Sequence, residues 1–162
     1  MRLLVYGAGV TGSLFSARLH EAGHDVSLLA RGERLAALRR HGVQLAEGDS
    51  PAVRRVPVPV VEHPADGYDL IAVFVRAHQV DAVLESLAGL EADVLFALNW
   101  AAGPEPLGAV IGPERVLFGF PAAAGRSISR PSPHLSSTSP ASRRSDSVTN
   151  NFSEQSRPWL PR

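Results

Sequence analysis

The sequence contains neither cysteine nor lysine. Without cysteine the chain can form no disulfide, no thiolate metal site and no cysteine nucleophile, which is typical of a cytoplasmic protein. All 16 basic residues are arginine, so no side-chain ammonium group is available for acid–base chemistry. The formal net charge of zero predicts no nucleic-acid partner. No apolar run reaches the ~18–20 residues that span a bilayer, so we expect no membrane association.

Strand-like and helix-like apolar patterns alternate up to residue 125. They predict strands at 2–6, 25–30, 69–75, 93–98 and 115–120, weaker strands at 43–45 and 53–61, and helices at 10–22, 33–41, 78–90 and 105–111. Pro57 and Pro59 place the segment 53–61 at a sheet edge or in a loop. Strands that alternate with helices pair in parallel through right-handed crossovers. We therefore predict an α/β domain with a doubly wound parallel sheet over residues 1–125.

Residues 126–162 have a different composition, with eleven serines against five in all that precedes them. They also hold five prolines and scattered arginines, and show neither a period of 2 nor one of 3.6. Such a segment buries too little apolar surface to offset its ordering entropy. Two interpretations stay open: a disordered Ser/Pro/Arg-rich tail, or the product of a frameshift in a GC-rich gene.

A glycine-rich loop of the form GxGxxG follows the first predicted strand and opens the first predicted helix. Its residues are Gly7, Ala8, Gly9, Val10, Thr11 and Gly12. The first glycine permits the tight turn, the second lets a pyrophosphate approach the backbone, and the third lets the helix pack closely on the strand. Free amides at the helix N-terminus favour phosphate. The loop therefore predicts a Rossmann-type dinucleotide site, with a glycine-rich turn of an unrelated α/β domain as the alternative.

The residue at the end of the second predicted strand bears on the choice of dinucleotide. An NAD site would place Asp or Glu there for the ribose 2′-hydroxyl, but this chain has Arg31, followed by Glu33 and Arg34. A guanidinium binds a 2′-phosphate through paired hydrogen bonds and gains little from a hydroxyl. We expect Glu33 to lie in the first turn of the next helix. The sequence thus predicts NADP(H), unless Arg31 is simply a solvated loop residue.

Over residues 1–125 the chain resembles the N-terminal domain of the ketopantoate reductase (2-dehydropantoate 2-reductase) family. Four stretches carry the resemblance, residues 6–12, 23–31, 75–79 and 98–99. The resemblance implies a Rossmann domain followed by a helical domain, with NADPH-dependent reduction of a 2-oxo acid in the cleft between them, as in pantothenate biosynthesis. The family's C-terminal helical domain has no counterpart in residues 126–162.

The resemblance also implies roles for single residues. Residues 7–12 match the pyrophosphate loop, and Arg31 matches the 2′-phosphate contact. Arg76 stands where the family usually has lysine near the cofactor, Asn99 matches an asparagine near nicotinamide and substrate, and Ala124 matches a backbone contact to the cofactor. Arg76 could otherwise be a surface arginine and Asn99 a turn residue. Two departures bear on the substrate: Trp100 replaces a usual glycine, and residues 120–123 replace a threonine-rich stretch.

Catalysis in the family uses a lysine and an acidic residue from the helical domain. This sequence has no lysine, and we identify in it no catalytic residue and no metal cluster. Three interpretations stay open: an NADP-dependent oxidoreductase by descent, which takes a 2-oxo acid only when a second domain completes it; a non-catalytic dinucleotide-binding module; and a non-functional fragment. Apolar surface that the family covers with helices would lead to self-association.

Overall fold

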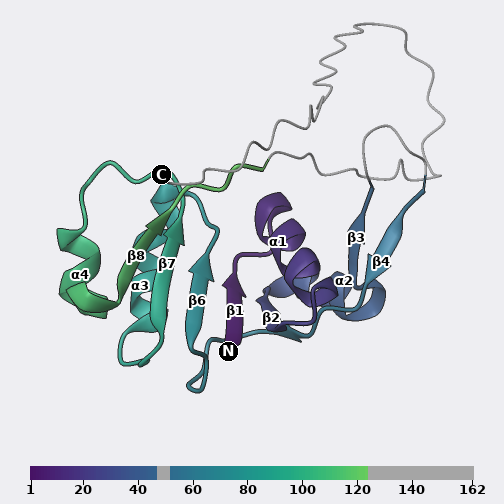
Figure 1. Cartoon of the computed structure of the whole chain (residues 1–162), viewed down its shortest axis with the longest axis horizontal. Helices are drawn as coiled ribbons and strands as arrows, with labels where there is room; N and C mark the ends of the chain where they lie inside the picture. Colours follow the sequence, from purple (N-terminus) through teal and green to yellow (C-terminus); the bar gives the residue numbers. More distant parts are fainter. Residues whose placement is uncertain (47–51, 124–162) are drawn as a thin grey trace, which may run out of the picture.

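A six-stranded parallel sheet forms the centre of the computed structural model, which describes residues 1–46 and 52–123 (Figure 1). The strand order is β5-β2-β1-β6-β7-β8. This is the order of the doubly wound dinucleotide-binding fold, with its switch point between β1 and β6. The predicted Rossmann-type fold is confirmed. Ala124 and the predicted tail of residues 126–162 lie outside the described residues.

The elements lie close to the predicted positions. The strands of the sheet are β1 (Arg2–Tyr6), β2 (Asp25–Leu29), β5 (Val60–Val61), β6 (Leu70–Val73), β7 (Asp93–Ala97) and β8 (Val116–Gly119). The helices are α1 (Val10–Glu21), α2 (Gly32–His41), α3 (Val80–Leu87) and α4 (Glu105–Ile111), with short 3₁₀ turns η1 (Ala77–Gln79) and η2 (Pro113–Arg115). Glu33 lies in the first turn of α2, as expected.

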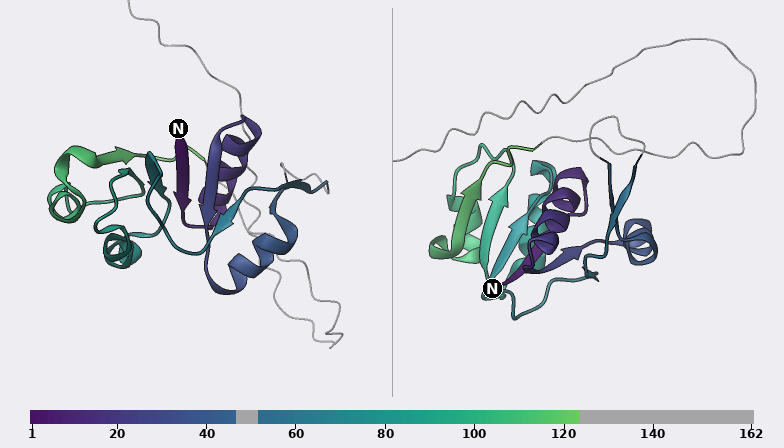
Figure 2. Two further views of the ribbon diagram at one scale, coloured as in Figure 1. Left: turned by 90° about the horizontal axis from the view of Figure 1, so that it is seen from below. Right: turned by 45° about the vertical axis from the view of Figure 1, so that its right-hand side comes forward.

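The central strands bury both faces, which explains their unbroken apolar runs. Leu3 and Val5 of β1 pack with α1 and α2, whereas Leu4 and Tyr6 pack with α3 and α4. Successive side chains of a strand point to opposite faces, so β1 contributes to both cores. Figure 2 shows α1 on one side of the sheet and α3 and α4 on the other.

The segment predicted as one weak strand at 53–61 forms two strands in different sheets. β4 (Arg54–Val56) pairs antiparallel with β3 (Val43–Leu45), while β5 is the edge strand beside β2. Pro57 and Pro59 separate them, because proline has no N–H to donate to a ladder. The expectation of a sheet edge is therefore confirmed for the second half of the segment. No helix within the described ranges is long and apolar enough to cross a bilayer.

Candidate functional site

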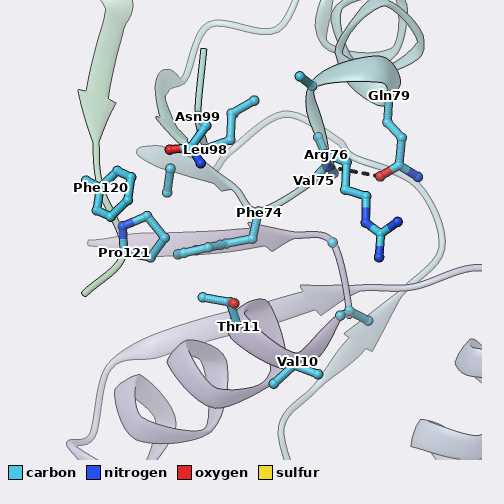
Figure 3. Close-up of a pocket in the computed structure, with 15 residues that line it drawn as sticks. Val10, Thr11, Phe74, Val75, Arg76, Gln79, Leu98, Asn99, Phe120 and Pro121 are labelled. Atoms are coloured by element: carbon cyan, nitrogen blue, oxygen red, sulfur yellow. Dashed lines mark hydrogen bonds between the residues drawn. The ribbon is translucent and has the colours of Figure 1, made fainter. Parts of the chain in front are cut away.

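A groove of about 720 Å³ lies at the carboxyl ends of the parallel strands (Figure 3). Its walls are the loops that follow β1, β6, β7 and β8, so it spans the switch point of the sheet, where ligands of such folds bind. Arg76 and Gln79 lie at one end of the groove and Asn99, Phe120 and Pro121 at the other, with Phe74 between them.

Two glycines of the loop are required by packing within the chain. Gly7 has a φ of +114°, and a Cβ there would lie 2.5 Å from the carbonyl oxygen of Phe74. A Cβ on Gly12 would lie 1.9 Å from the carbonyl oxygen of Gly7. Neither position can hold a side chain without moving backbone. These glycines therefore let α1 begin directly against the ends of β1 and β6.

Gly9 differs from Gly7 and Gly12, because no atom beyond Gly9 and the two residues next to it in the chain lies within 4 Å of where its Cβ would be. Its backbone is extended, with φ −74° and ψ −169°, which any residue can adopt. Gly9 lines the groove, so the space beside it is open to a ligand. Only close approach of another group to this backbone explains a glycine here on steric grounds.

The N-terminus of α1 faces the same space with its amides available. Gly9 is the N-cap residue, no side chain caps the helix, and its first turn contains no acidic residue. The first intrahelical bond is donated by the Ser13 amide to the Gly9 carbonyl oxygen, at 2.9 Å. The amides of residues 10–12 precede it, and such N-terminal amides bind anions. Val10 and Thr11 line the groove beside them.

Arg31 follows β2 and lies outside the groove lining. Its Nη2 donates a hydrogen bond of 2.7 Å to the hydroxyl of Tyr6, the last residue of β1. The guanidinium carbon also lies 5.8 Å from the centre of the Tyr6 ring. The structure therefore holds Arg31 next to the glycine loop, at the strand end where dinucleotide folds bind the ribose.

Arg34 helps to hold the glycine loop in place, whereas sequence reasoning noted it only as a neighbour of Arg31. Its Nε donates to the carbonyl oxygen of Ala8 and its Nη2 donates to the Ser13 hydroxyl, each at 3.0 Å. It thereby ties α2 to both sides of the glycine loop. Its place in the first turn of α2, directly after Arg31 as the N-cap residue, was the available signal.

Arg76 begins the turn after β6 with its backbone fixed by Gln79. The Arg76 amide donates a 3.0 Å hydrogen bond to the Gln79 Oε1, which starts the 3₁₀ turn η1 (Figure 3). Both residues are exposed and line the groove. A cationic side chain at this end can attract a phosphate or carboxylate. Gln79 was not identified from the sequence.

Asn99 lines the groove two residues after the end of β7, close to where sequence reasoning placed it. The next residue, Trp100, donates from its indole nitrogen to the Gly103 carbonyl oxygen at 2.6 Å and packs against the core under α3 and α4. Trp100 is thus partly buried beside Asn99, and Asn99 is exposed to the groove.

Seven of the predicted residues line one groove: Gly7, Ala8, Gly9, Val10, Thr11, Arg76 and Asn99. Gly12 packs beneath this loop and Arg31 lies behind it. Ala124 lies outside the described residues. Across residues 1–46 and 52–123, no group of three His, Asp or Glu side chains is placed to hold a metal ion.

The family model for ketopantoate reductase PanE/ApbA matches residues 3–129. The chain belongs to this family. The 2-dehydropantoate 2-reductase of Archaeoglobus fulgidus is 32% identical over 106 residues, which cover 65% of this chain and 34% of the relative. The corresponding protein of Lactococcus lactis is 26% identical over 74% of this chain and 40% of its own length. This chain of the ketopantoate reductase family thus spans about a third to two fifths of the length of these relatives.

Solved structures with the same fold include two dehydrogenases or reductases. A D-mandelate dehydrogenase in complex with NADH and anilino(oxo)acetate superposes with a TM-score of 0.65 at 26% identity, over 74% of this chain and 40% of that one. A ketopantoate reductase homologue from Ralstonia solanacearum MolK2 superposes with a TM-score of 0.60 at 29% identity, over 72% of this chain and 43% of that one.

Proposed function

We propose that this chain binds NADP(H) in the groove and contributes the cofactor half of a 2-oxo acid reductase site. The chain's own atoms fit a dinucleotide. The open space at Gly9 admits a pyrophosphate against the backbone, and the uncapped, acid-free first turn of α1 supplies amides for its charge. We place these contacts within the domain of residues 1–125.

The choice of NADP(H) rests chiefly on one observation, the position of Arg31 at the end of β2. The similar D-mandelate dehydrogenase was solved with NADH, so the fold alone does not select the cofactor. Here the strand end carries Leu29, Ala30 and Arg31 and no acid. A guanidinium there favours a 2′-phosphate over a 2′-hydroxyl.

The names of the relatives, 2-dehydropantoate 2-reductases, support a 2-oxo acid as the proposed substrate class. A bound nicotinamide would supply a hydride to a substrate carbonyl. Asn99, exposed at the opposite end of the groove from Arg76, has an amide that can both donate and accept a hydrogen bond. It is suited to orient a 2-oxo acid but cannot supply a proton as an acid would. Because the sequence has no lysine, we propose that the 162-residue chain alone binds cofactor without turnover.

Calorimetry and a turnover assay test this proposal together. NADPH titrated into the purified chain is expected to bind with a Kd in the micromolar range or weaker, since the chain spans only about a third to two fifths of the length of its relatives. Incubation with NADPH and 2-dehydropantoate, or with pyruvate as a simpler 2-oxo acid, should leave the NADPH absorbance unchanged. Robust oxidation of NADPH by either compound would contradict the proposal of binding without turnover.

Replacing Arg34 by alanine is expected to weaken the binding of NADPH and of NADH to the same extent. Arg34 holds the glycine loop through Ala8 and Ser13, and its loss would let the loop fluctuate. We expect Kd to rise about three- to tenfold for NADPH and NADH alike, within the range of one or two charge-assisted hydrogen bonds at an exposed site. Arg39→Ala, an exposed position on the same helix, is the charge-matched control. A loss confined to NADPH would show that Arg34 reads the 2′-phosphate instead.

We also propose that the chain associates with itself through the β8 side of the sheet. Leu117 is 44% exposed and Phe118 49% exposed on β8, which pairs only with β7 among the described strands. An apolar edge strand of this kind favours contact with a second copy. Light scattering is expected to show oligomers at high concentration, and Leu117→Ser should shift the population toward monomer. A monomeric wild-type chain would count against this surface.

A further inference from the structure

A line of three hydrogen bonds connects Arg31 to the core of α3. The Arg31 Nη2 lies 2.7 Å from the Tyr6 hydroxyl, which lies 3.0 Å from the Ser86 hydroxyl. The Ser86 hydroxyl donates in turn to the Val83 carbonyl oxygen at 2.8 Å. Tyr6 is only 5% exposed, so β1, α3 and the start of α2 are joined by this line on one face of the sheet.

The donor of each bond follows from the chemistry of the groups. Arginine only donates, so the Tyr6 oxygen accepts from Arg31. Ser86 gives its single proton to Val83, so its oxygen accepts the proton of Tyr6. Each hydroxyl therefore donates once and accepts once, and only one orientation of the line satisfies all three bonds. A hydroxyl so oriented presents a fixed lone pair to the guanidinium.

Arg31 keeps most of its binding capacity in this arrangement. One of its five N–H groups is used by Tyr6. The ion pairs found in the described residues involve no partner for Arg31. The ring of Tyr6 lies against the guanidinium, with 5.8 Å between centroid and carbon, a contact that restrains the side chain. The cation is thus oriented by a neutral group while its remaining donors are available to an anion.

We propose that Tyr6, oriented by Ser86, is a positioning residue that sets the preference for a 2′-phosphorylated dinucleotide by holding Arg31 in place. The proposal rests on the assignment of NADP(H) above. Pre-orienting a long side chain lowers the entropy lost when it binds. This smaller entropy loss strengthens the binding only of a ligand that Arg31 contacts. Tyr6 should therefore strengthen the binding of NADPH and leave that of NADH unchanged.

A double-mutant cycle tests this role. Kd values for NADPH and NADH are measured by calorimetry for the full chain with Tyr6→Phe, with Arg31→Gln and with both changes. Tyr6→Phe is expected to raise the Kd of NADPH about fivefold and that of NADH less than twofold, because the lost hydrogen bond restrains Arg31 and does not touch the ligand itself. In the Arg31→Gln background the same change should have no further effect. Ser86→Ala should also raise the Kd of NADPH more than that of NADH, but by less than Tyr6→Phe does.

Tyr68→Phe is the matched control, because Tyr68 precedes β6 at the opposite end of the sheet and contacts Arg2. It should change neither Kd. If Arg31→Gln leaves NADPH affinity unchanged, the NADP(H) assignment fails, and this proposal with it. If Arg31→Gln weakens NADPH binding but Tyr6→Phe weakens both dinucleotides equally or neither, the assignment stands and the positioning role of Tyr6 is overturned.

Discussion

Replacing Gly12 by alanine is expected to lower the free energy of unfolding by about 3 kcal/mol or more, at the upper end of the cost of overpacking. The added Cβ would lie 1.9 Å from the Gly7 carbonyl oxygen, and this neighbour is backbone that cannot rotate away. Relief requires α1 to move away from the ends of β1 and β6. Thermal and urea unfolding of the purified variant would measure the loss.

The same substitution at Gly9 should separate binding from folding. No atom of the described chain would meet the new Cβ, and the backbone is extended. Stability should therefore change by less than about 1 kcal/mol, because the gain from the stiffer unfolded chain is offset by alanine being a poorer N-cap residue than glycine. Dinucleotide affinity should fall about tenfold or more, because the methyl group occupies the space of the pyrophosphate. Unchanged NADPH affinity in Gly9→Ala would place the pyrophosphate elsewhere.

Changing Arg31 to aspartate is expected to reverse the cofactor preference. The substitution removes charge-assisted bonds to a 2′-phosphate and places a carboxylate where NAD sites have one. The Kd of NADPH should rise about a hundredfold or more, since lost attraction and new repulsion add. The Kd of NADH should stay the same or fall, because a carboxylate accepts from a ribose hydroxyl.

Arg39→Asp makes the same change of charge on the exposed surface of α2 and serves as the control for Arg31→Asp. It should shift both Kd values equally and by little, because exposed charges are screened by salt. Calorimetry of both variants with both dinucleotides at one ionic strength makes the comparison. Equal losses of NADPH affinity in the two variants would mean that Arg31 acts only through its long-range charge and makes no direct contact with the 2′-phosphate.

Much of the fold could be predicted from the sequence because local and tertiary signals agree. The apolar runs of β1 and β6 contribute to the cores on both faces of the sheet, and the crossover rule then allows few arrangements. The segment at 53–61 was harder to assign, since its strand pattern continues across two prolines. The pairing of β4 with β3 depends on tertiary contacts, among them the burial of Val56, that no local pattern shows.

The glycine loop could be placed in advance because it directly follows a predicted parallel strand, and the family resemblance indicated Arg76 and Asn99 near the ends of two others. Strand ends of one sheet meet at one edge, so residues far apart in sequence share a groove. The hydrogen bonds of Tyr6, Ser86 and Arg34 could not be predicted in this way. Their side chains come from a strand end and two helices, and their meeting depends on how those helices rotate and pack.

The most direct test of the NADP(H) assignment is calorimetric titration of the unmodified chain with NADPH and, separately, with NADH under identical conditions. If Arg31 reads a 2′-phosphate, NADPH should bind about tenfold or more tightly than NADH, as expected for charge-assisted hydrogen bonds to that group. Equal affinities, or tighter binding of NADH, would contradict the assignment.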